Sequence, residues 1–275
     1  MAAKDLTGRP IVITGASSGI GRATAFACAQ AGMPVTLAAR RADRLEAVRE
    51  QIETLGGRAI AVAADVQHKE DCERLKAEAE AAFGTVYSVF ANAGYGFQGA
   101  IDATPESELR RIFEVNFWGS LNTILPFVDG MKSAGAGHLL MCSSCLSKLA
   151  LPYYGAYSAT KAAQDHFGRS MRLELRGTGV HVSTVHPVGT RTEFFDVADE
   201  QSAGGATLVK NTPDRFMQPP EKVADAIVAC LRRPRGEVWT SFGTRLQMAL
   251  ATLLPGTADR ALAGIIAKRQ QSASS

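Results

Sequence analysis

The stretch from Thr14 to Gly21 reads TGASSGIG, and the fold prediction starts from it. It follows the apolar run Ile11 to Ile13 and precedes the alanine-rich segment ATAFACAQAG, so its glycines fall at a turn from a buried strand into a helix. Gly15 allows a tight turn, Gly19 lets the backbone approach a phosphate, and Gly21 lets the helix pack closely on the strand. The N–H groups of the first helical turn then face the anion. An ordinary glycine-rich turn has the same spacing, so other residues must decide between the two interpretations.

The bulk composition is that of a globular protein without bias toward a special class of partner. The chain has 275 residues, of which 46% are hydrophobic and 21% charged, and its formal net charge is +3. This length suits a single large α/β domain over residues 1–275 better than two average domains. The basic residues are dispersed rather than grouped in runs, so we expect no nucleic-acid partner.

The start of the chain and its cysteines indicate the compartment. The opening MAAKDLTGRP has no apolar core of a signal peptide, and no stretch reaches the roughly 18 apolar residues of a spanning helix. We therefore expect a cytoplasmic protein with no membrane span and with reduced thiols at its five cysteines. Cys142 and Cys145 form a CxxC pair, but no second pair and no histidine at zinc-finger spacing accompany it, so we expect no metal site.

Short apolar runs alternate with polar helical patterns along the chain. One long helix is expected from Thr104 as N-cap, with Pro105 at the first helical position and a kink at Pro126, and a later one is expected to end at Gly177. The alternation predicts an α/β fold with a parallel sheet of about seven strands, helices on both faces and right-handed crossovers. The runs that predict strands are 11–13, 35–40, 58–66, 86–94, 138–144, 180–187 and 237–241.

Two segments differ from this alternation. Residues 188–220 are rich in Gly, Thr, Asp and Pro and predict a substrate loop with short helical pieces, because a loop of this length inside a compact domain is usually functional. Residues 245–269 predict an amphipathic helical extension broken by a Pro-Gly pair. Its apolar part, Leu246 to Leu254, is too short to span a bilayer. It could lie on a membrane surface or cover the substrate pocket, but we expect it to pack against the domain or a partner subunit.

Tyr157 and Lys161 are four residues apart in a predicted helix, so their side chains share one face. A tyrosine donates protons poorly at neutral pH, since its reference pKa is about 10, and a cation one turn away stabilises its phenolate. The pair is therefore a candidate acid/base. Ser144 follows the preceding predicted strand, where its hydroxyl can hydrogen-bond a substrate oxygen beside the tyrosine.

Taken together, these residues resemble the short-chain dehydrogenase/reductase family. The matching features are TGASSGIG, the NAG at Asn92 to Gly94, Asn116, Ser144 and the YSATK that starts at Tyr157, in the family's order and spacing. The resemblance runs from about residue 11 to residue 241. It implies a Rossmann-type, doubly wound sheet and hydride transfer between a nicotinamide cofactor and a carbonyl or alcohol. It also implies a homodimer or homotetramer, formed through the long helices near Thr104 and Tyr157.

The resemblance also implies roles for four residues. Tyr157 is expected to donate or accept the proton, and Ser144 to position and polarise the carbonyl. Lys161 is expected to lower the pKa of the tyrosine and to hold the nicotinamide ribose. Asn116 is expected to anchor a water molecule that continues a proton relay from Lys161.

The expected cofactor contacts are on the glycine-rich turn, the end of the second strand, the adenine pocket, the NAG loop, the acid/base pair and the segment after the sixth strand. They are Gly15, Ser17, Ser18, Gly19, Ile20, Gly21, Arg40, Arg41, Asp65, Val66, Asn92, Ala93, Gly94, Tyr157, Lys161, Pro187, Thr190 and Thr192. Asn92 is expected to brace the sheet rather than to touch substrate. Val188 departs from the family pattern, which commonly has glycine there, so the backbone before Thr192 is not fixed by the resemblance.

The end of the second strand predicts the type of dinucleotide. An acidic residue there hydrogen-bonds the 2′-hydroxyl of NAD, whereas a nearby arginine accommodates the 2′-phosphate of NADP. Here the sequence reads Ala39, Arg40, Arg41, with no carboxylate to repel a phosphate and a guanidinium that can pair with it. We expect NADP(H), although both arginines would also suit a solvated helix start.

The substrate is expected to be a small carbonyl or alcohol compound of apolar character. His186 is expected to be structural rather than to face the site. A non-catalytic NADP(H)-binding redox sensor or scaffold is the alternative, and the intact set of proposed catalytic residues argues against it. Aromatic residues expected to border the site, although plain packing would equally explain them, are Phe97, Tyr153, Tyr154, Phe194 and Phe195.

Overall fold

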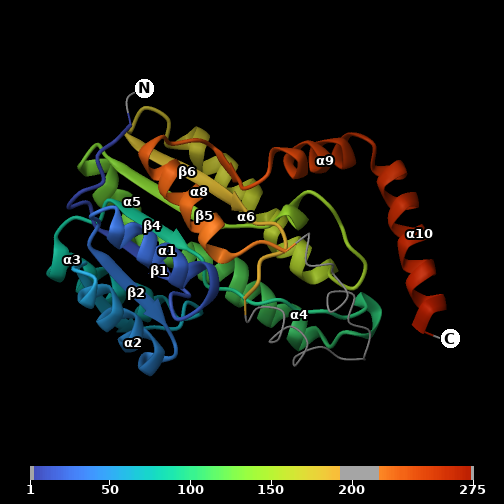
Figure 1. Cartoon of the computed structure of the whole chain (residues 1–275), viewed down its shortest axis with the longest axis horizontal. Helices are drawn as coiled ribbons and strands as arrows, with labels where there is room; N and C mark the ends of the chain where they lie inside the picture. Colours follow the sequence, from blue (N-terminus) through green and yellow to red (C-terminus); the bar gives the residue numbers. More distant parts are fainter. Residues whose placement is uncertain (1–2, 193–216, 274–275) are drawn as a thin grey trace.

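The core of the structure is one seven-stranded parallel sheet, with strand order β3-β2-β1-β4-β5-β6-β7 (Figure 1). The computed structural model describes residues 3–192 and 217–273, with side-chain environments up to residue 264. The prediction of a Rossmann-type, doubly wound sheet is confirmed. The strands are β1 (Ile11–Thr14), β2 (Val35–Ala39), β3 (Ala59–Ala63), β4 (Ser88–Ala91), β5 (Gly137–Cys142), β6 (Val180–His186) and β7 (Glu237–Trp239).

Helices cover both faces of this sheet. The helices α1 (Gly19–Gln30), α2 (Ala42–Thr54) and α8 (Pro220–Arg232) share one core cluster, and α3 (Lys69–Phe83), α5 (Gly119–Ser133) and α6 (Gly155–Glu174) share the other (Figure 1). Neighbouring residues of one strand divide between the clusters, as side chains on a pleated strand must. Near-continuous apolar strands are therefore required, because neither face of the sheet meets water.

The strand order places a crevice at the carboxyl edge of the sheet. The chain moves outward from β1 through β2 to β3 and then returns to add β4 on the other side of β1. The loops that follow β1 and β4 therefore diverge, and ligands of doubly wound folds bind at such a switch point. The candidate site lies at this edge.

The prediction of one continuous helix from Thr104 is wrong both in the residue where the helix starts and in its continuity. The Thr104 hydroxyl donates to the carbonyl of Ala100 after a short 3₁₀ turn, Ile101–Ala103, and Pro105 is the N-cap. The helix then divides into α4 (Glu106–Phe113), a π-helical turn (Glu114–Trp118) and α5. A π-turn inserts one residue into the helical repeat, which apolar periodicity does not reveal.

Three further observations concern the predicted segments. The helix α6 ends at Glu174, and Gly177 lies in the turn beyond it with a φ of 88°. Only the two ends of the predicted substrate loop 188–220 are described, and they are held together: the N–H of Gln218 donates to the carbonyl of Gly189, and that of Arg191 to the carbonyl of Gln218. Phe194 and Phe195 lie outside the described residues.

The C-terminal extension forms two helices, α9 (Phe242–Leu253) and α10 (Pro255–Ala273). In Figure 1 they extend from the end of β7 along one side of the molecule, with α10 standing apart from the sheet and its covering helices. In the described ranges, no helix combines the length and the apolar character needed to cross a membrane.

Candidate functional site

The glycine-rich turn after β1 is held by unusually close backbone packing. Gly15 has a φ of 65°, a conformation that favours glycine. A Cβ on Gly21 would lie 2.3 Å from the carbonyl oxygen of Gly15, so only glycine lets α1 begin this close to the strand. The Asn92 side-chain amide donates to the carbonyl oxygen of Thr14 at 3.0 Å, which ties the end of β4 to the turn. Asn92 thus braces the sheet, as the sequence led us to expect.

A cavity of about 560 Å³ opens above this turn, along the carboxyl ends of the strands. Most residues predicted to contact cofactor or substrate line it, although they come from widely separated parts of the chain. Gly21 and Asn116 are not among the lining residues. The predicted residues that do line the cavity are Gly15, Ser17, Ser18, Gly19, Ile20, Arg40, Arg41, Asp65, Val66, Asn92, Ala93, Gly94, Ser144, Tyr157, Lys161, Pro187, Thr190 and Thr192.

Part of the wall was not foreseen from the sequence. Apolar and aromatic side chains from irregular segments face the cavity beside Tyr157, and a basic side chain from α4 accompanies them. Tyr95 carried one available signal, since it directly follows the NAG loop. Leu146, Leu151 and Met217 have none, because short turns and irregular segments lack the periodicity that marks a buried face, whereas Arg111 and Val115 lie on α4 and the π-helical turn. Unforeseen wall residues include Tyr95, Arg111, Val115, Leu146, Leu151 and Met217.

Of the three described aromatic residues predicted to border the site, Tyr154 lines the cavity, whereas Phe97 and Tyr153 do not. Tyr154 lines the cavity and is buried beside Tyr157, with ring centroids 6.5 Å apart. Phe97 is buried in the same small apolar cluster, behind the wall. Tyr153 does not line the cavity, and its φ of 67° is the one positive value for a non-glycine residue in the described chain.

Ser144, Tyr157 and Lys161 are brought together as the sequence suggested, and all three are buried. Ser144 follows β5 and its hydroxyl oxygen accepts from the N–H of Leu146 at 3.1 Å. Tyr157 and Lys161 are one turn apart on α6, with the ammonium 5.6 Å from the centre of the tyrosine ring. The Lys161 ammonium also donates to the carbonyl of Cys142 at 2.7 Å, which anchors it at the end of β5.

Burial dominates the titration of this group. It raises the pKa of Tyr157 well above its ordinary value, and a hydrogen bond with Ser144 acts in the opposite direction. Burial lowers the pKa of Lys161 from 10.5 to about 8. The phenol therefore holds its proton at neutral pH, and the buried ammonium is close to releasing one.

Asn116 occupies the π-helical turn and is fully buried. Its side-chain oxygen accepts from the N–H of Tyr95 at 2.9 Å, and its amide nitrogen donates to the carbonyl of Tyr95 and to the Thr160 hydroxyl. The side chain therefore fixes the loop after β4 to α6. Its expected part in a proton relay stays a prediction.

The end of β2 presents two guanidinium groups to the cavity. Arg41 donates to the hydroxyls of Ser17 at 3.2 Å and Ser18 at 3.3 Å, so its charge lies on the glycine-rich turn. Arg40 lines the same part of the wall. Asp65 is the one acidic lining residue among those described, and its carboxylate accepts from the backbone and side chain of Gln67. The wall near the turn is therefore basic.

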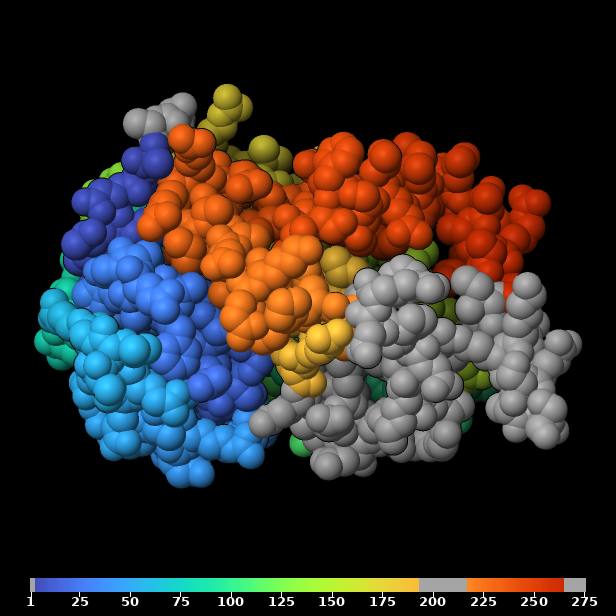
Figure 2. Space-filling view, in the orientation of Figure 1, coloured from blue at the N-terminus to red at the C-terminus, as the bar shows by residue number. Residues whose placement is uncertain are grey.

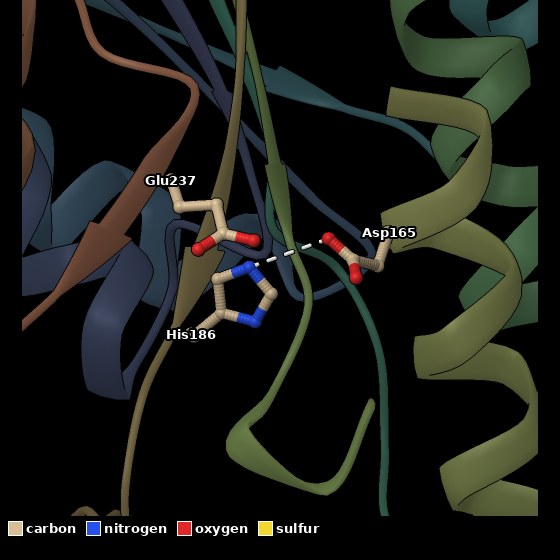
Figure 3. Close-up of side chains that lie close together, drawn as sticks. All are labelled: Asp165, His186 and Glu237. Carbon is tan, nitrogen blue, oxygen red and sulfur yellow. Dashed lines mark ion pairs between the residues drawn. The ribbon is translucent and has the colours of Figure 1, made fainter. Parts of the chain in front are cut away.

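A second polar cluster contacts the backbone of Ser144 through His186. Asp165, His186 and Glu237 converge from α6, β6 and β7 (Figure 3), with one potential metal-ligating atom from each within 4.8 Å of the others. The Lys148 ammonium already contacts both carboxylates, at 2.5 Å from Asp165 and 3.2 Å from Glu237. Burial alone would raise the pKa of Asp165, but hydrogen bonds from His186 and Lys148 lower it well below its usual range. The Lys148 ammonium thus supplies a positive charge between the two carboxylates.

His186 has the structural role that was expected. Its ring is fully buried and stacks on Trp239 with centroids 4.5 Å apart. Its Nδ1 lies 3.1 Å from the carbonyl oxygen of Ser144, and its Nε2 faces the carboxylate of Asp165. The cluster therefore supports the backbone of Ser144.

The two cysteines of the CxxC pair lie in different elements. Cys142 is buried within β5, whereas Cys145 begins the short 3₁₀ turn that follows Ser144. All five cysteines lie in the described part of the chain, and all are free thiols.

Replacing Lys161 by methionine should change how stability depends on pH. Between about pH 8 and pH 10.5 an unfolded lysine binds a proton that the folded protein has released, so the free energy of unfolding of the wild type rises with pH in that window. Relative to Lys161→Met, the rise should reach about 3 kcal/mol. Thermal or urea unfolding from pH 7 to 10.5 measures it, with the exposed Lys222→Met as control. Parallel curves for wild type and Lys161→Met would contradict the lowered pKa.

The comparison with family models matches residues 9–203 to the short chain dehydrogenase model. Among individual relatives, an uncharacterized oxidoreductase of Listeria innocua, Lin0452, is 32% identical over 227 residues, which cover 82% of this chain and 90% of that protein. The glycine betaine reductase ATRR of Emericella nidulans is 34% identical over 236 residues, or 83% of this chain. This chain corresponds to 18% of the length of that larger protein.

Solved structures agree with this match. An alcohol dehydrogenase from Thermococcus sibiricus, complexed with 5-hydroxy-NADP, is 30% identical with a TM-score of 0.73 and covers 84% of this chain and 94% of its own. A short chain dehydrogenase/reductase from Burkholderia phymatum in complex with NAD has a TM-score of 0.84 at 24% identity, covers 93% of this chain and 96% of its own, and supports the fold. The chain therefore belongs to the short-chain dehydrogenase/reductase family of oxidoreductases, whose members bind nicotinamide cofactors.

Proposed function

We propose that the protein is an NADP(H)-dependent oxidoreductase that interconverts a carbonyl and an alcohol, with Tyr157 as acid/base. The observation that carries this proposal is the shared cavity: Ser144, Tyr157 and Lys161 line the same space as the glycine-rich turn and Arg40. A bound dinucleotide and a carbonyl compound would thus be in contact. The whole proposal concerns one domain, residues 1–275.

The turn fits a dinucleotide phosphate. Gly15 and Gly19 have positive φ values, and a Cβ on Gly19 would come within 3.0 Å of Thr192, so side chains would fill the cradle that glycine leaves open. The N–H groups at the start of α1 face this cradle. Ser17, Ser18, Ile20 and the segment from Pro187 to Thr192 would hold the rest of the cofactor.

The choice of NADP over NAD rests on Arg40 and Arg41. A guanidinium pairs with a phosphate dianion in a bidentate manner, and no carboxylate at the end of β2 opposes it. The Thermococcus sibiricus relative is complexed with 5-hydroxy-NADP and the Burkholderia phymatum structure with NAD, so the family match leaves this choice to the residues of the chain itself.

The chain's own residues account for the proton transfer. When bound, the cofactor supplies or accepts the hydride at its nicotinamide ring. Tyr157 keeps its proton because burial raises its pKa, so it can donate to the oxygen of a carbonyl as negative charge develops there. Ser144 hydrogen-bonds the same oxygen and fixes its position. Lys161 places a cation beside the phenol, which stabilises the phenolate left behind.

The wall next to Tyr157 favours an apolar substrate. Leu146, Leu151, Tyr154 and Met217 present mainly carbon to the cavity, and Tyr95 adds an aromatic edge. Such a lining gains free energy by removing apolar surface from water but offers few partners to a polyol. We propose a ketone, aldehyde or alcohol with an apolar body.

Assembly and location are also proposed. Trp118, Leu125 and Phe167 are exposed on the π-turn, α5 and α6, which supports a homodimer or homotetramer through these long helices. Free thiols at all five cysteines fit the reducing cytoplasm. A non-catalytic NADP(H) sensor or scaffold remains the alternative, and it would need the glycine-rich turn but not the buried tyrosine.

Tyr157→Phe should abolish turnover while leaving the fold and cofactor binding intact, because it removes only the hydroxyl. We expect kcat for reduction of a ketone and aldehyde panel to fall by about 10²–10⁴-fold. Binding of NADPH, followed by its fluorescence, should change little. Tyr87→Phe, which removes a hydroxyl remote from the cavity, is the matched control. Near wild-type turnover in Tyr157→Phe would remove the tyrosine from the mechanism, and binding without turnover by the wild type would favour the sensor.

Arg40→Gln should weaken the binding of NADPH more than that of NADH. The wild type should show the higher kcat/KM with NADPH than with NADH, and Arg40→Gln should raise KM for NADPH by about tenfold or more with little effect on NADH, since a charged hydrogen bond is worth about 1.5–3 kcal/mol. Arg44→Gln, on α2 just after Arg40 and away from the cavity wall, is the control. An equal or higher kcat/KM with NADH in the wild type would overturn the cofactor assignment.

A further inference from the structure

The C-terminal helix α9 presents a row of large apolar side chains to solvent. Eleven large hydrophobic side chains are exposed in the described part of the chain, and five of them fall within residues 242–254. The four on α9 are three or four residues apart and share one face, and the fifth directly follows the helix. They are Phe242 (77% exposed), Leu246 (50%), Leu250 (50%), Leu253 (74%) and Leu254 (58%), and we call them the apolar row.

The opposite face of α9 fixes the helix to the body of the protein. Met248 is buried and Thr244 and Ala251 are half-buried, while the Thr252 hydroxyl donates to the carbonyl of Lys148 at 3.3 Å. Ser241 caps the start of the helix by accepting from the N–H of Thr244. The expected packing against the domain therefore uses one face of α9, and it holds the apolar row outward.

The segment from α9 to the C-terminus carries the net positive charge of the chain. Residues 242–275 contain one acidic residue, Asp259, and four basic ones, Arg245, Arg260, Lys268 and Arg269, so they account for the whole formal net charge of +3. The remaining 241 residues are neutral in sum. Figure 2 shows residues 242–264 of this segment as one continuous stretch of surface beyond α8.

We propose that α9 and α10 dock this protein on an anionic lipid surface, with the apolar row inserted at the boundary between headgroups and acyl chains. A helix held flat, with Phe and Leu on one side and basic residues near by, matches the shape of an interfacial segment. Anionic headgroups attract Lys and Arg close to the surface. Lipid also accepts a single apolar row without a complementary shape on the other side.

A second copy of the chain fits this row less well. Pairing two such tails would bring together segments of equal positive charge. A stable protein interface engages about 20–30 residues on each side, whereas the row offers five large apolar side chains. The exposed apolar residues of α5 and α6 already provide a separate face for oligomerisation.

Docking would place the candidate site next to the lipid. The helix α9 contacts the turn Cys145–Ser147, and the loop from this turn to α6 supplies Leu146 and Leu151 to the cavity wall. If the proposed function holds, an apolar substrate dissolved in the membrane would thus reach the cavity from the docked side. Lipid binding itself does not depend on any catalytic residue.

Co-sedimentation of the full-length protein with vesicles tests the proposal. Binding to vesicles of phosphatidylcholine with phosphatidylglycerol should exceed binding to phosphatidylcholine alone, and it should fall as salt is raised. Leu246→Gln with Leu250→Gln should lower the partition coefficient at least about tenfold, since each leucine loses apolar burial. Leu55→Gln with Leu173→Gln, which changes two leucines elsewhere that are more exposed than Leu246 and Leu250, should leave it unchanged.

Light scattering after gel filtration, over a range of protein concentrations, tests whether a second copy of the chain covers the apolar row instead of lipid. The proposal predicts the same oligomeric state for the wild type and for Leu246→Gln with Leu250→Gln. Absence of binding to anionic vesicles, equal binding by both double variants, or an oligomer that dissociates only in the α9 variant would overturn it. Far-UV circular dichroism and NADPH binding confirm that the variants are folded, so a failure here is separable from a failure of the proposed activity.

Discussion

The close approach of α1 to the turn after β1 is the constraint on which the site depends. The carbonyl of Gly15 occupies the space that a Cβ on Gly21 would need, and the amide of Asn92 joins the same turn from β4. The turn after β1 and the start of α1 therefore meet backbone to backbone, and the side-chain amide of Asn92 links the end of β4 to them. This contact sets the start of α1 and the direction in which the loops after β1 and β4 diverge, and the cavity lies between those loops.

Burial gives the polar groups of the site their chemistry. The Ser143 hydroxyl donates to the carbonyl of Lys161 and the Lys161 ammonium to the carbonyl of Cys142, so β5 and α6 are joined twice beside the phenol. The cluster of Lys148, Asp165 and His186 supports the next turn of chain from the other side. Because these groups are withdrawn from water, hydrogen bonds rather than solvent fix where each proton resides. The site is thus rigid on its protein side and open toward the cavity.

Local sequence patterns predicted the sheet, the glycine-rich turn and the placement of Ser144, Tyr157 and Lys161, because each is encoded within a few neighbouring residues. The π-turn at Asn116 escaped prediction, since Asn116 is fixed there by hydrogen bonds to the distant loop of Tyr95. The start of α4 after Pro105 was also missed, because a short 3₁₀ turn precedes it. The cluster that contacts Ser144 through His186 was missed as well. Its members Lys148 and Glu237 are 89 residues apart and meet only once β5, α6 and β7 are in place. Wall residues such as Leu151 and Met217 lie in irregular segments, where side-chain direction has no period to detect.

If the proposed function holds, this cavity brings a nicotinamide ring against a carbonyl carbon. The most direct measurement is the transfer of deuterium from NADPH labelled at nicotinamide C4, on each face in turn, to a panel of apolar ketones and aldehydes, with mass spectrometry of the alcohol formed. We expect one deuterium on the former carbonyl carbon with one of the two labelled cofactors. Alcohol without deuterium from either cofactor, or bound NADPH with no alcohol across the panel, would rule out direct hydride transfer in this cavity.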